Sequence, residues 1–143
     1  MTRATLLALA ERVEAATGAD RELDGLVFAH MNPDKRVIIG QKPGRFPQDP
    51  IYGGPLDIIW IDGFADVLGA PRYTASLDAA MSLVPSGLIL RNYQSSRFVP
   101  HSCEVALSWA HGGWLGNSDH SFALALTAAC LRARAIAGSL PND

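Results

Sequence analysis

The chain has 143 residues, of which 48% are hydrophobic and 18% are charged, and this composition is that of a folded domain rather than a disordered chain. Twelve Lys and Arg against fourteen Asp and Glu give a net charge of −2, which lacks the basic excess of nucleic-acid-binding domains. No apolar run reaches the roughly eighteen residues of a membrane span. We therefore expect neither a nucleic-acid partner nor a membrane partner.

The cysteine content and the N-terminus predict a cytoplasmic protein. Cys103 and Cys130 are too few for a disulfide framework, and their apolar neighbours favour buried, reduced thiols. The N-terminal stretch ATLLALA is shorter than a secretory apolar region and ends at Glu11 and Arg12. We therefore expect no signal peptide.

Helical spacing predicts two helices in the first part of the chain. The first covers residues 3–17, with Thr2 as its N-cap and Gly18 as a left-handed stop. The second is shorter, is capped by Asp20 and ends at Asn32-Pro33. The buried face of the first is Leu6, Leu9, Val13 and Ala16, and that of the second is Leu23, Leu26, Val27 and His30.

The segment from about 34 to 72 is irregular. RVII at 36–39 and the stretch LDIIWID predict two short strands. Between them, QKPGRFPQDPIYGGP contains four prolines and three glycines, so residues 40–56 are neither a helix nor a central strand. No shift of composition marks a second domain, and we expect residues 1–143 to form a single one.

A third helix is predicted within YTASLDAAMSLVP, with Thr74 as its cap and Pro85 as its stop. SGLILRNY and CEVALSW then predict two antiparallel strands, because the loop between them is too short for a parallel crossover. HGGWLGNSDH is interpreted as a turn into a last helix, which is capped by Ser118 or Asp119 and extends to Ala137. Its many alanines predict a close approach to a sheet or to another helix.

This order of elements predicts an α+β fold, arranged as a three-layer α-β-α sandwich with a small, mostly antiparallel sheet and helices at both chain ends. The segments PRYTASLDAAMSLVP and LALTAACLRARA resemble the phage ABA sandwich domain, a family of small phage and prophage proteins. The resemblance covers about the first thirty residues and residues 71–137. It implies the same three layers and a bacterial host cytoplasm, and it implies no catalytic residue or ligand.

Residues 101–120, HSCEVALSWAHGGWLGNSDH, contain most of the reactive side chains. Strand alternation places Cys103 on one face with Val105, Leu107 and Trp109, which predicts a core thiol. The side chains that would form a metal site are His101, Cys103, His111 and His120, but no CxxC or HxxxH spacing completes a ligand set. We therefore predict no metal, no cofactor and no catalytic residue.

Three carboxylates in the middle of the chain are further candidates for a functional site. Asp57 and Asp62 face opposite sides of one strand, and Asp62-Gly63 fits a turn, so neither these nor Asp66 predict an acid–base pair.

Two further regions are candidates for binding. Lys42 and Arg45 in GQKPGRF offer a glycine-flanked anion site without the GK[ST] ending of a P-loop. Trp60 would line such a pocket together with Phe46 or Tyr52. Trp114 either covers the end of the core or forms a contact surface.

These observations lead to one functional expectation and two alternatives. We expect a phage-type or prophage-type accessory protein that binds a protein partner, or a second copy of itself, rather than catalysing a reaction. The first alternative is a protein that binds or sequesters a nucleotide-like or anionic ligand. The second is a small hydrolase that uses Cys103 with a histidine, which the predicted raised pKa of a buried thiol disfavours.

Overall fold

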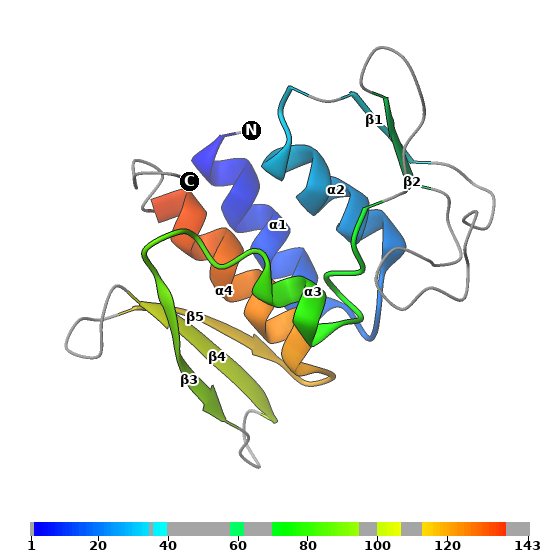
Figure 1. The fold of residues 1–143 in the computed structure, drawn as a ribbon. Helices are drawn as coiled ribbons and strands as arrows, with labels where there is room; N and C mark the ends of the chain where they lie inside the picture. Colours follow the sequence, from blue (N-terminus) through cyan, green and yellow to red (C-terminus); the bar gives the residue numbers. More distant parts are fainter. Residues whose placement is uncertain are drawn as a thin grey trace.

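The computed structural model describes residues 2–34, 36–39, 58–61, 70–94, 100–106 and 113–136. It has an α+β fold with helices at both ends and a three-stranded antiparallel sheet (Figure 1). The elements are α1 (Arg3–Ala15), α2 (Arg21–Met31), β1 (Arg36–Ile39), β2 (Ile58–Ile61), α3 (Leu77–Met81), β3 (Ile89–Gln94), β4 (His101–Ala106), β5 (Gly113–Ser118) and α4 (Phe122–Ile136).

The strands form two separate sheets. β3, β4 and β5 pair in that order, and the register of β4 with β5 runs from His101 opposite Ser118 to Ala106 opposite Gly113. β1 and β2 form an antiparallel pair of their own, which contacts α2. The predicted strand at 36–39 and the predicted antiparallel pairing of β3 with β4 are confirmed.

Helix α4 lies at the centre of the fold (Figure 1). It packs on β4 and β5 with one side and on α1 with the other, and every residue from 123 to 131 is buried. A Cβ at Gly116 of β5 would overlap the carbonyl oxygen of Ala125, so the helix and the strand approach backbone to backbone. The predicted close approach of the alanine-rich helix is confirmed.

The predicted fold class is correct in its coarse form. The order of layers seen in the structure is sheet, then α4, then α1, with both helices on the same side of the sheet (Figure 1). A sandwich with the sheet between two helical layers is not confirmed by the part of the chain that the structure describes. It stays a prediction.

The N-terminal helices follow the predicted capping with one exception. The Thr2 hydroxyl accepts a hydrogen bond from the Thr5 N–H, and the Asp20 carboxylate accepts one from the Leu23 N–H. The predicted left-handed stop at Gly18 is wrong. Helix α1 ends at Ala15 because Ala16 is extended, with a ψ of 139°, and Gly18 does not adopt a positive φ.

The predicted cap of the third helix is also wrong. Ser76, not Thr74, caps α3, and its hydroxyl accepts a hydrogen bond from the Ala79 N–H. The helix spans only Leu77–Met81, and Met81 at its end is 42% exposed. The Thr74 hydroxyl is engaged with α2 instead.

HGGWLGNSDH is mostly a strand rather than the predicted turn, because residues 113–118 form β5. Its glycines permit a close approach of neighbouring backbone, because a Cβ at Gly113 would overlap the carbonyl oxygen of Val105. The cap of α4 is Ser121, whose hydroxyl accepts a hydrogen bond from the Leu124 N–H, and not Ser118 or Asp119. Ser118 accepts from the His120 N–H within the preceding bend.

Candidate functional site

The predicted binding residues are only partly covered by the structure. Lys42 and Arg45, with Phe46 and Tyr52, lie outside the described residues, as do Asp57, Asp62 and Asp66. Trp60 lies in β2 opposite Val37, and its side chain is not described. Trp114 lies in β5, is partly buried and packs against the core, which is the first of the two interpretations of this side chain.

The histidine and the cysteine of β4 contribute to packing. His101 lies edge-on to Phe122 with a ring separation of 4.7 Å, and its Nδ1 is 3.1 Å from the Ser118 carbonyl oxygen. Cys103 is fully buried, and burial raises the pKa of its thiol to about 11. His120 is exposed at the bend before α4, and His111 lies outside the described residues. A thiol held protonated in this way disfavours Cys–His catalysis.

Within the described ranges, no three His, Cys, Asp or Glu side chains come together in a group that could hold a metal ion. The second cysteine, Cys130 of α4, is also free and buried, and burial raises the pKa of its thiol to about 12. Both thiols therefore belong to the core of the protein.

A buried polar cluster joins α2 to the segment before α3, and the sequence did not indicate it. The Asp24 Oδ1 atom accepts hydrogen bonds from the N–H and from the hydroxyl of Thr74, each at 2.8 Å. Its Oδ2 atom accepts from the Arg21 guanidinium at 3.1 Å, and both side chains of this ion pair are 2% exposed. Arg21 also donates to the Pro71 carbonyl oxygen.

This cluster is best explained as a structural contact that holds α2 against the segment before α3. Burial raises the pKa of Asp24, against the opposing effects of the Thr74 hydrogen bonds and the Arg21 charge. Its polar groups are directed at one another, so it offers no open face to a substrate. The Arg21-x-x-Asp24 spacing within the predicted helix was the available signal, but its partner Thr74 lies fifty residues away.

A second ion pair fastens the other side of the fold. Arg132 of α4 donates two hydrogen bonds to the carboxylate of Glu14 in α1, at 2.5 and 2.6 Å. Glu14 also accepts from the Asn117 N–H at 2.7 Å, and Arg132 also donates to the Leu115 carbonyl oxygen at 2.8 Å. Both charged groups are therefore committed to holding α1, α4 and β5 together.

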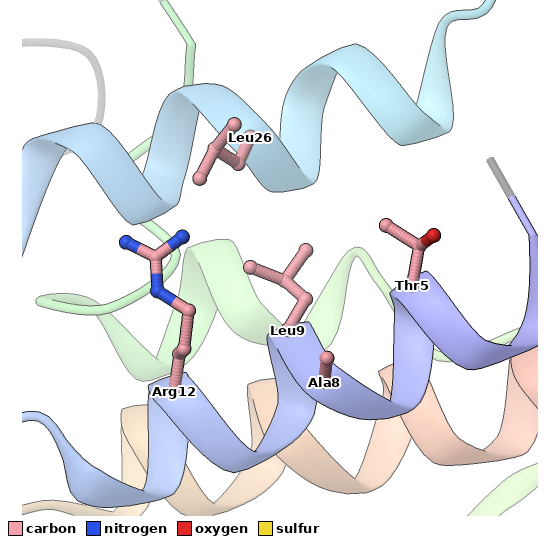
Figure 2. Close-up of a pocket in the computed structure, with 5 residues that line it drawn as sticks. All are labelled: Thr5, Ala8, Leu9, Arg12 and Leu26. Carbon is pink, nitrogen blue, oxygen red and sulfur yellow. The ribbon is translucent and has the colours of Figure 1, made fainter.

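An apolar groove lies between α1 and α2. It measures about 170 Å³ and is lined by Thr5, Ala8, Leu9 and Arg12 of α1 and by Leu26 of α2. Figure 2 shows Leu26 facing Leu9 across the groove, with Thr5 towards one end and Arg12 towards the other. No local pattern of residues predicts this groove, because it arises from the packing of two helices whose facing residues are separate in the chain.

Arg12, the cationic side chain that lines the groove, forms only a weak ion pair. The Arg12 guanidinium is 3.8 Å from the Glu22 carboxylate, and the two side chains are 55% and 58% exposed. An exposed pair at this distance contributes little, so Arg12 is able to pair with an incoming anion. The groove therefore combines apolar walls with a cation at one end, which is an arrangement that accepts an amphipathic ligand.

Comparisons with known proteins identify no relative: no protein-family model, no curated protein and no solved structure matches the chain. Among the helices that the structure describes, none has the length and apolar character needed to cross a membrane.

Proposed function

We propose that this protein is a phage-type or prophage-type accessory protein of the bacterial cytoplasm that acts by binding a protein partner rather than by catalysis. The phage assignment rests on the resemblance of YTASLDAA and the following LVP to the phage ABA sandwich domain. The binding assignment rests on one observation, the groove between α1 and α2.

The groove fits an amphipathic helix of the partner. Leu9, Leu26 and Ala8 give it apolar walls, and parallel ridges of two helices commonly receive an apolar helix face. Arg12 is among the lining side chains and Glu22 is not, so an acidic residue beside the apolar anchor of the partner is favoured. The ligand is therefore a helix that carries a leucine-like anchor and a neighbouring carboxylate.

Several other charged side chains form hydrogen bonds or ion pairs within the fold. Glu14, Asp24, Arg21 and Arg132 bond to one another or to backbone groups within the fold. Arg91 and Glu104 form an ion pair between β3 and β4. These side chains stabilise the protein, whereas Arg12 combines exposure with a position on the wall of a groove.

A displayed library of helical peptides, selected on the purified protein, tests the proposal. We expect enriched peptides with an apolar anchor and an acidic residue within one turn of it, whose binding is abolished by Leu26→Glu. The charge reversal Arg12→Glu should shift the enriched residue from acidic to basic. Met81→Glu, which changes an exposed apolar residue outside the groove, is the matched control and should leave binding unchanged. Enriched peptides that bind Leu26→Glu as tightly as the parent would contradict the proposal.

A further inference from the structure

Among the strands that the structure describes, β5 is an outer strand of the three-stranded sheet, with one edge paired to β4 and no strand paired to the other (Figure 1). Two hydrogen bonds identify the backbone groups on the outer edge. The Asn117 N–H donates to the Glu14 carboxylate, and the Leu115 carbonyl oxygen accepts from the Arg132 guanidinium. Alternate residues of an antiparallel strand bond to the same side. Gly113, Leu115 and Asn117 therefore direct their backbone groups outward.

Glu14 and Arg132 occupy this edge. Their side chains are 22% and 25% exposed, they bond to each other through both guanidinium nitrogens, and each also bonds to one outward backbone group of β5. An open edge strand is a template for pairing with another chain, and proteins block such edges with charged side chains. The ion pair takes the place that a neighbouring strand would take.

We propose that the outer edge of β5 is a latent pairing surface for β5 of a second copy of this chain, and that the Glu14–Arg132 pair holds it closed. The surface is distinct from the α1–α2 groove and does not depend on the function proposed above. Opening requires that the Glu14 and Arg132 side chains leave the edge and that α1, which also contacts β5, leaves room for the second strand. The pairing of β5 with β4 is not disturbed.

The arrangement of outward groups suits a twofold axis at Leu115. In that register, Leu115 pairs with its own equivalent, and Gly113 pairs with the equivalent of Asn117, so every outward backbone group meets a counterpart. Such a self-complementary contact closes at two copies. Leu115 is 47% exposed in the single chain, and this pairing would cover it with the same apolar side chain.

The double variant Glu14→Leu/Arg132→Met tests whether the ion pair blocks strand pairing at the outer edge of β5. It removes both charges, so neither is left buried without its partner. We expect a twofold rise in mass by sedimentation equilibrium, with the parent protein remaining a single chain at the same concentration. Arg134→Met is the matched control, because Arg134 lies on the same helix and donates to the Leu83 carbonyl oxygen instead. It should not change the mass.

Cysteine crosslinking tests the register. Directly opposed residues of a hydrogen-bonded antiparallel pair have Cα atoms about 5.5 Å apart, which a disulfide spans. Leu115→Cys in the double variant should give covalent dimers on oxidation, whereas Asn117→Cys, which faces Gly113 of the second copy, should not. The native thiols are buried and do not compete.

Three results would overturn the proposal. The first is a folded double variant that stays a single chain, and the second is a dimer in which both cysteine positions crosslink equally. If circular dichroism shows the double variant to be unfolded, Glu14→Gln, which keeps the shape of the side chain, replaces it. Leu115→Cys is then introduced both into the Glu14→Gln protein and into the parent. The third result is a crosslinking yield that is no higher in the Glu14→Gln protein than in the parent. A double variant that binds extended peptides but remains a single chain would also overturn the proposal. It would show that the edge pairs with another protein.

Discussion

Asp24 and Thr74, fifty residues apart in the chain, share one carboxylate oxygen: the N–H and the hydroxyl of Thr74 both donate to the Asp24 Oδ1 atom at 2.8 Å. Thr74 also accepts a hydrogen bond from the Asp20 N–H. Residues 32–69 separate α2 from residue 70 in the chain, and this contact joins the two sides. The threonine of YTASLDAA is thus a fastening residue and not a helix cap.

Thr74→Val should lower the free energy of unfolding by about 1–3 kcal/mol, because it leaves a buried carboxylate short of a donor. Urea denaturation followed by circular dichroism measures the change. Ser76→Ala, which removes only the cap of α3, is the comparison and should cost about 1 kcal/mol. A valine variant as stable as the parent would show that the cluster does not fasten the segment.

Gly116→Ala should destabilise the protein by more than about 3 kcal/mol or prevent folding, because the added Cβ overlaps the backbone of α4. Gly18→Ala is the matched control. Nothing lies within 4 Å of a Cβ there and the residue has no positive φ, so the free energy of unfolding should rise by about 0.4–1 kcal/mol. Thermal unfolding distinguishes the two. Equal melting temperatures would contradict the described contact between α4 and β5.

The Glu14–Arg132 pair should make stability fall in acid. Burial alone would raise the pKa of Glu14, but hydrogen bonds from Arg132 and Asn117, with the charge of Arg132, bring it below its ordinary value of 4.5. A carboxyl group with a lowered folded pKa stabilises the folded state above the ordinary pKa, and this stabilisation is lost as pH falls through the folded pKa. The difference in free energy of unfolding between the parent and Glu14→Gln should therefore be largest at neutral pH and vanish in acid. A difference that is constant with pH would contradict the ion pair.

The two cysteines should resist thiol reagents in the folded protein. Burial raises the pKa of the Cys103 thiol to about 11 and that of Cys130 to about 12, so almost no thiolate is present at pH 8. Labelling with a disulfide reagent should be slow until denaturant is added, and two thiols should then react. Rapid labelling of Cys103 without denaturant would reopen the hydrolase alternative.

Local signals predicted the parts of the fold that depend on local interactions. The caps Thr2 and Asp20 and the strand at 36–39 are set by neighbouring residues, and the structure confirms them. β5 was misread because Gly113 and Gly116 are typical of turns, whereas here they permit contact with Val105 and Ala125. No local pattern carries that information.

The candidate site was even less accessible from the sequence. Leu9 and Leu26 each fit the apolar face of a predicted helix, but the groove between them depends on how α1 and α2 pack. A cation such as Arg132 is favourable near the C-terminal end of a helix, yet its partner Glu14 is 118 residues away. Pairings at such separations follow from the tertiary arrangement.

We propose above that the groove between α1 and α2 binds a partner helix. The most direct measurement is an amide chemical-shift map of isotopically labelled protein titrated with a peptide enriched in the selection described above. The account predicts that the largest shifts fall on Thr5, Ala8, Arg12 and Leu26 and are lost in Leu26→Glu. Shifts centred instead on β3 to β5, with the signals of α1 and α2 unmoved, would contradict it.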